Sequence, residues 1–185
     1  MTSLAIQRMR ALWKGESMFA LVDPAAGEAV RRMIGDYPEN KFCVVQGWQQ
    51  EMFAGFSPWL LSLKIERPSF EALIHQSWGK SRAIFLCSSL PPAKLLDHFY
   101  QIWLVSSPDG SRQYFRYYDP RVFRSFFQVA LVEQLNLLFC DGLHAFYAES
   151  EDGKNLHCYD RKERGLMEKF AGYSLIKEWK VQMAP

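Results

Sequence analysis

The feature that most constrains the fold is residues 114–130, YFRYYDPRVFRSFFQVA, because the hydrophobic period changes within this stretch. Residues 114–118 are aromatic apart from Arg116 at their centre, a composition that predicts a β-strand. Asp119 suits the N-cap of a helix, and Pro120 suits the first helical position, where its missing N–H is not needed. The apolar residues that follow recur with helical spacing. The stretch therefore predicts a strand, a capped turn and an amphipathic helix.

The rest of the chain also predicts strands that alternate with helices. Short apolar runs predict buried strands at residues 18–22, 41–46, 59–65 and 81–88. Helical spacing predicts helices at residues 24–34, 68–78, 91–103, 120–130 and 161–170, and residues 131–139 continue the fourth of these with or without a kink. Two Asp-Gly turns predict hairpins that join residues 104–106 to 113–118 and residues 144–149 to 156–160.

This alternation predicts an α/β fold with a mixed, partly parallel central sheet flanked by helices. Strands that are apolar throughout are typical of sheets covered on both faces, where parallel pairing is common. The two hairpins add antiparallel edges. We expect three parts: an N-terminal extension at residues 1–17, an α/β core at 18–140, and a small C-terminal hairpin-plus-helix lobe at 141–185, packed on the core.

The composition excludes several classes of protein. Hydrophobic residues make up 49% of the chain and aromatic residues 15%, which is enough for a core without disulfide bonds. The net charge of +2 lacks the basic excess of a nucleic-acid binder. No apolar run approaches the roughly 20 residues of a membrane span, so no membrane insertion is expected. The four cysteines form no C-x-x-C pair, which indicates a reducing, cytoplasmic compartment.

Motifs of common enzymes and ligand sites are absent from the sequence. There is no G-x-S-x-G elbow, P-loop, G-x-G-x-x-G fingerprint or H-E-x-x-H helix. The histidines are spread along the chain without ligand spacing: His75, His98, His144 and His157. We therefore expect no metal, no cofactor and no catalytic residues. A cysteine or serine nucleophile beside a histidine stays open, because catalytic partners need not be close in sequence.

The charged residues around the central turn allow two interpretations. In the first, Arg116 pairs with Asp119 or another acid and locks the turn, while Asp119 and Pro120 cap the helix. Asp23 and Pro24 repeat this Asp-Pro device after the first strand. In the second interpretation, a basic and aromatic patch binds a partner chain, since arginine and tyrosine are favoured at interface hot spots. The residues of this patch are Arg116, Tyr118, Arg121 and Arg124.

Residues 115–122, FRYYDPRV, resemble the "fRfyDPRv" hallmark of the effector adaptors, or chaperones, of the bacterial type VI secretion system, the Tap/Tec/VasW-like proteins. Other patterns of this family occur in the same order along the chain. They are an opening strand and turn, a "PyLv.L" segment, a "w..gi.l.S" strand and an aspartate-glycine turn, at residues 18–23, 58–63, 78–88 and 107–110. The resemblance extends over about residues 18–139, nearly the whole expected core.

The resemblance implies a bacterial cytoplasmic adaptor without enzymatic activity. Such a protein binds one secreted effector, a toxin, and helps to load it onto the spike protein VgrG. Two other classes stay open: an uncharacterised hydrolase-like enzyme and a structural subunit of a larger assembly. Aromatic residues of the C-terminal part either hold a segment of the effector or close the protein's own core. These residues are Phe146, Tyr147, Tyr159, Tyr173 and Trp179.

Overall fold

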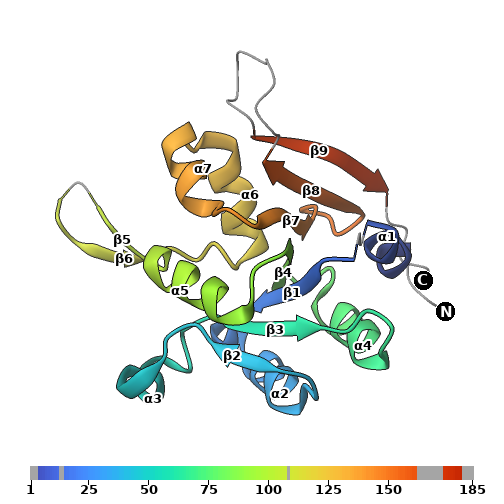
Figure 1. Cartoon of the computed structure of the whole chain (residues 1–185), viewed down its shortest axis with the longest axis horizontal. Helices are drawn as coiled ribbons and strands as arrows, with labels where there is room; N and C mark the ends of the chain where they lie inside the picture. The colour runs from blue at the N-terminus through green and yellow to red at the C-terminus, as the bar shows by residue number, and fades with distance from the viewer. Residues whose placement is uncertain (1–3, 13–14, 108, 162–172, 181–185) are drawn as a thin grey trace.

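The computed structural model of the chain describes residues 4–12, 15–107, 109–161 and 173–180. A central antiparallel sheet lies between two layers of helices (Figure 1). The strands of this sheet are β1 (Ser17–Val22), β2 (Lys41–Cys43), β3 (Trp59–Leu63), β4 (Ala83–Ser88), β7 (Leu143–Glu149), β8 (Asn155–Arg161) and β9 (Tyr173–Lys180). Their order across the sheet is β2-β3-β1-β4-β7-β8-β9. A separate hairpin, which projects from the body in Figure 1, consists of β5 (Leu104–Ser106) and β6 (Arg112–Tyr114).

The helices connect successive strands and cover both faces of the sheet. They are α1 (Leu4–Leu12), α2 (Glu28–Asp36), α3 (Gln50–Phe53), α4 (Pro68–Ser77), α5 (Pro92–Ile102), α6 (Pro120–Val129) and α7 (Val132–Leu138). Two short 3-10 helices, η1 (Pro24–Ala26) and η2 (Gly47–Gln49), precede α2 and α3. Among the described helices, none has the length and apolarity that crossing a lipid bilayer requires.

The expectation of a partly parallel sheet is wrong, because every described strand pair is antiparallel. The helix-connected strands β1 and β2 do run in the same direction, and so do β3 and β4. However, β3 lies between β1 and β2, and β1 lies between β3 and β4. Each strand-helix-strand unit is thus split by an inserted strand of opposite direction. The apolar strands reflect burial on both faces, which antiparallel pairing also permits.

The sheet separates two hydrophobic cores. Met18, Ala20 and Val22 of β1 contact the core under α1, α2 and α4. Phe19 and Leu21, on the opposite face of the same strand, contact the core under α5, α6 and α7. This alternation follows from the two-residue period of a strand. All the apolar residues of β1 therefore contribute to packing, because each face of the strand contacts a different layer of helices.

Both predicted hairpins occur, with small changes of their ends. The second hairpin is β7 with β8, and β7 also pairs with β4, so the described C-terminal strands extend the central sheet. The division at residue 140 stays a prediction. The predicted helix at residues 161–170 lies outside the described residues, apart from residue 161 at the end of β8.

The strand predicted at residues 113–118 is too long. β6 ends at Tyr114, and Arg116 lies in a turn in which the Asp119 N–H donates to the Arg116 carbonyl oxygen at 3.0 Å. Tyr117 and Tyr118 are both buried, whereas successive side chains of a strand point to opposite faces. The aromatic residues around Arg116 therefore belong in part to a turn with two inward-facing tyrosines.

Candidate functional site

The hallmark segment meets the first Asp-Pro turn of the chain where β1 ends. Asp23 caps η1, and its Oδ1 accepts a hydrogen bond from the Ala25 N–H at 2.8 Å. Pro24 occupies the first helical position. The second carboxylate oxygen of Asp23, Oδ2, accepts a hydrogen bond from the guanidinium group of Arg116. Arg116 thus ties the turn after β1 to a segment 93 residues further along the chain.

The second Asp-Pro turn is built in the same way and shares this arginine. Asp119 is the N-cap of α6, and its Oδ1 accepts a hydrogen bond from the Arg121 N–H at 2.9 Å. The Arg121 guanidinium also binds this carboxylate with two contacts, Nε–Oδ1 at 3.0 Å and Nη2–Oδ2 at 2.7 Å. Arg116 Nη2 lies 3.4 Å from Asp119 Oδ2. We call Asp23, Arg116, Asp119 and Arg121 the Asp-Pro clamp.

The clamp balances two buried carboxylates against two partly exposed guanidinium groups. The side chains of Asp23 and Asp119 are 2% and 3% exposed, whereas those of Arg116 and Arg121 are 40% and 63% exposed. Burial raises the pKa of Asp119, but the hydrogen bonds and charge of Arg121 outweigh it and hold this pKa below its ordinary value. The ion pair between Asp119 and Arg121 is therefore formed at neutral pH.

Acid is expected to weaken the clamp through Asp119. Because the pKa of Asp119 in the folded protein lies below its ordinary value of 3.8, the stabilisation is complete above that value and is lost as pH falls through the folded pKa. We expect the free energy of unfolding of the wild type to fall below about pH 4, and to fall less steeply in Asp119→Asn. Urea denaturation across the acid range measures both slopes.

The matched control for this experiment is Asp36→Asn, which removes an exposed carboxylate from the last residue of α2. The pH dependence of this variant should follow that of the wild type. Equal acid slopes in wild type and Asp119→Asn would contradict the assignment of this carboxylate as a source of acid sensitivity.

The aromatic residues of the hallmark pack inside the protein. Tyr117 is fully buried, donates a hydrogen bond to the Phe99 carbonyl oxygen at 3.1 Å and stacks on the Phe99 ring with 5.4 Å between centroids. Tyr118 is also buried, and its hydroxyl donates to the Phe56 carbonyl oxygen at 3.4 Å. Phe115 packs on Phe126 of α6 with 4.6 Å between centroids. These contacts and the clamp give the hallmark a structural role in this chain.

Arg124, the last member of the predicted basic patch, is also engaged within the chain. Its Nη1 donates to the Glu149 carbonyl oxygen at 2.7 Å. The carboxylate of Glu149 accepts hydrogen bonds from the backbone N–H groups of Gly79 and Ser81, the latter at 2.7 Å. Ser81 has a positive φ of 51°, a conformation that costs energy for a non-glycine residue. Arg124 and Glu149 therefore connect α6 and β7 to the strained loop before β4.

Partner binding by the predicted patch of Arg116, Tyr118, Arg121 and Arg124 stays a prediction. Arg116 and Arg121 are partly exposed, whereas Tyr118 is 2% exposed. Phe146, Tyr147 and Tyr159 are also buried, so for these three residues the structure favours the interpretation as core. The side chains of Tyr173 and Trp179 lie outside the described part of the protein.

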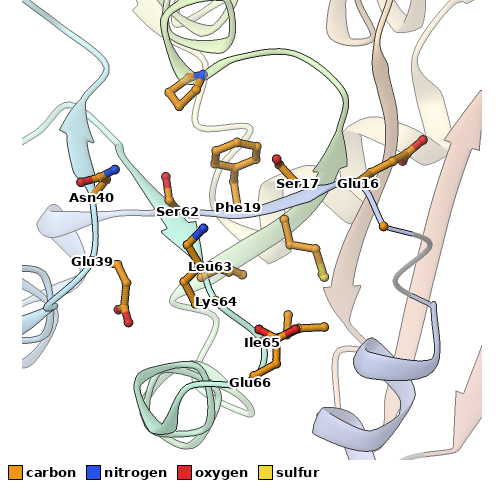
Figure 2. A pocket seen from close by; sticks show the side chains of 13 residues that line it. Glu16, Ser17, Phe19, Glu39, Asn40, Ser62, Leu63, Lys64, Ile65 and Glu66 are labelled. Atoms are coloured by element: carbon orange, nitrogen blue, oxygen red, sulfur yellow. The ribbon is translucent and has the colours of Figure 1, made fainter.

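An open pocket of about 640 Å³ lies where β1 begins and β3 ends (Figure 2). Its charged lining residues are Glu16, Glu39, Lys64 and Glu66. The described lining contains no histidine and no cysteine. The described lining therefore contains no cysteine–histidine or serine–histidine pair, although it includes the hydroxyl groups of Ser17 and Ser62.

One histidine of the described chain does lie beside a serine and an acid. His144 Nε2 is 3.2 Å from Ser89 Oγ and 3.3 Å from Glu16 Oε1. In a serine triad, the nucleophile and the acid contact different nitrogens of the ring. Here both contact the same nitrogen, so the arrangement is not that of a triad. Among the described residues, no group of three or more histidine, cysteine or acidic side chains is placed to bind a metal ion.

The geometry of the hallmark agrees with a comparison to known families. Residues 18–137 match the family described as "Domain of unknown function (DUF4123)", and the chain belongs to this family. The family is known in type VI secretion effector adaptors. Searches of curated proteins and of solved structures found no match. The matched residues include the whole Asp-Pro clamp and end within α7.

Proposed function

We propose that the protein is an adaptor that binds one secreted effector of a type VI secretion system and helps to load it onto the spike protein VgrG. The observation that carries this proposal is the family match over residues 18–137, since the family is known in effector adaptors. The adaptor acts by binding and positioning, without catalysing a reaction. Its site of action is the bacterial cytoplasm, before the effector leaves the cell.

Two features of the structure support a binding role. The Asp-Pro clamp joins distant segments into a rigid framework, as a protein that presents a binding surface requires. His144, which lies beside Ser89 and Glu16, contacts both through the same ring nitrogen rather than as a serine triad would. The hallmark therefore supports the shared fold, and we place effector recognition on other surfaces.

The proposal is tested by affinity capture followed by a secretion assay. The tagged protein, expressed in its host under conditions in which type VI secretion is active, is expected to retain one toxin-like protein, with or without VgrG, as identified by mass spectrometry. Deleting the gene for this chain should remove that effector from the culture supernatant, while VgrG is still released.

The control is Arg121→Ala, which keeps the fold because Asp119 retains Arg116 as a partner. This variant should capture the effector as well as the wild type does. A folded wild-type protein that retains no effector, or an effector whose secretion survives the deletion, would contradict the adaptor function.

A further inference from the structure

The exposed large hydrophobic side chains of this protein gather on one layer. None of those described belongs to α1, α2 or α4, the helices that cover one face of the sheet. They come from η2 and α3, from the end of α5 and the β5-β6 hairpin, and from α6 and α7. Scattered single hydrophobic residues are normal on a protein surface, but such segregation marks an interaction site.

The segment around α3 contributes the most exposed of these side chains. Trp48, Met52 and Phe56 recur every four residues and are 82%, 64% and 61% exposed. The segment is anchored to the core, since Phe53 makes an edge-to-face contact with the buried Trp103 at 5.6 Å between centroids. The apolar side chains therefore point outward on a backbone that is held in place.

The β5-β6 hairpin continues this surface. All six of its strand residues are exposed, including Leu104, Val105 and Tyr114. The hairpin is held at its base by Trp103, whose ring lies 5.0 Å from that of Tyr114 and 6.4 Å from that of Tyr100. Tyr100 also reaches the α3 segment, because its hydroxyl donates to Gln49 Oε1 at 3.2 Å. We call residues 48–56, the exposed Asp97 and Tyr100 of α5, and the hairpin the α3–hairpin surface.

The area of this surface is that of a specific protein interface. The exposed fractions of its seven large apolar side chains, scaled by residue size, correspond to roughly 800 Å², about what each partner contributes to a standard-size complex. The largest apolar patch of an ordinary monomer is about 300–600 Å². The α3–hairpin surface is thus comparable in size with one side of such an interface.

The charge of this region indicates the chemistry of the partner. Residues 46–56 and 97–115 contain one arginine, Arg112, against three acids, Glu51, Asp97 and Asp109, a net charge of −2 in a chain of net charge +2. Burial lowers the pKa of His98, so this residue adds no positive charge at neutral pH. The other polar residues there include Gln49, Gln50 and Gln113. A matching partner has an apolar centre flanked by lysine or arginine.

We propose that the α3–hairpin surface binds the secreted effector, through an apolar face of the effector that is flanked by basic side chains. This inference rests on the proposed adaptor function. In the proposed function, the adaptor holds the effector before it meets the spike. An exposed apolar surface of this size promotes aggregation when it is uncovered, so its occupant is the lasting partner rather than the spike that is met at delivery.

Site-specific photocrosslinking in the host tests this placement. The crosslinking residue p-benzoyl-phenylalanine is introduced separately at Trp48 and Val105, which lie on the α3–hairpin surface. The matched control positions are Arg32 of α2 and Gln76 of α4, which are exposed on the opposite layer. We expect the first two positions to form an adduct with the effector and the control positions to form none.

The possible outcomes separate this inference from the proposed function. Adducts with the effector from the control positions alone would overturn the placement and leave the adaptor function intact. Adducts of Trp48 or Val105 with a second copy of the chain, or with VgrG and no effector, would overturn the chosen occupant. If no position captures an effector and affinity capture also fails, both proposals are wrong.

A charge reversal tests the predicted chemistry with the purified effector. Glu51→Lys combined with Asp97→Lys should weaken effector binding by about tenfold or more at low salt, with a smaller difference at high salt. The control, Asp36→Lys with Glu66→Lys, changes the net charge equally at sites outside the α3–hairpin surface and should leave affinity nearly unchanged. An equal loss in both double variants would contradict a specific acidic rim.

Discussion

Replacing Arg116 with alanine is expected to lower the free energy of unfolding by about 2–3 kcal/mol, because it leaves the buried carboxylate of Asp23 without its charged partner. Breaking a fully buried ion pair costs about 3–5 kcal/mol, and the partial exposure of Arg116 reduces this value through solvent screening. Denaturation in guanidinium chloride measures the change. We expect Arg116→Lys to recover only part of the loss, since lysine keeps the charge but lacks the planar guanidinium group with its several N–H donors.

Arg121→Ala is the matched comparison for this prediction. It removes a second guanidinium group from the same cluster, but this side chain is 63% exposed and Asp119 keeps Arg116 as a partner. The expected loss is about 1 kcal/mol or less. Equal losses for Arg116→Ala and Arg121→Ala would show that the connection between the two turns contributes nothing beyond a surface ion pair.

Phe146→Ala is expected to lower the free energy of unfolding by about 3–5 kcal/mol, the usual cost of truncating a buried phenylalanine. Phe146 is fully buried, and its ring packs against Phe123 at 5.0 Å and Phe139 at 5.1 Å between centroids. The truncation leaves a cavity between β7 and the layer of α6 and α7, where the Phe146 ring makes its contacts. Thermal and chemical denaturation should both show that Phe146→Ala is less stable than the wild type.

Phe56→Ala provides the opposite case with the same substitution. Its side chain is 61% exposed on the α3–hairpin surface, so stability should change by less than about 1 kcal/mol while effector binding is lost or strongly weakened. A stable Phe146→Ala protein that fails to bind the effector would instead place this residue at an interface and contradict its assignment to the core.

Local structure could be predicted from the sequence where the contacts that determine it lie between adjacent residues. Asp119 and Pro120 begin α6, and Asp23 and Pro24 begin η1, because an N-cap carboxylate and an N1 proline act on adjacent residues. Strand pairing could not be predicted, because it depends on segments far apart in the chain. Nothing in the sequence of β3 reveals that it lies between β1 and β2, and this placement makes the sheet antiparallel.

The candidate site shows the same limit. The sequence predicts that Arg116 pairs with Asp119 or another acid, but it does not identify Asp23, although the repeated Asp-Pro dipeptide was a usable signal. The sequence does not indicate the α3–hairpin surface, because the regular spacing of Trp48, Met52 and Phe56 normally indicates a buried face. The glutamines between them are the one local hint that this segment faces solvent.

The position of β1 has a consequence for how the protein is made. β1 is the first strand of the chain, yet its two neighbours are β3 and β4, and its terminal turn is fixed by Arg116. A nascent chain that has emerged from the ribosome only as far as α4 has β1 with one edge unpaired, which is a template for unwanted strand association. β1 is paired on both edges once β4, which ends at Ser88, has emerged, and its terminal turn is fixed only after Arg116 has followed.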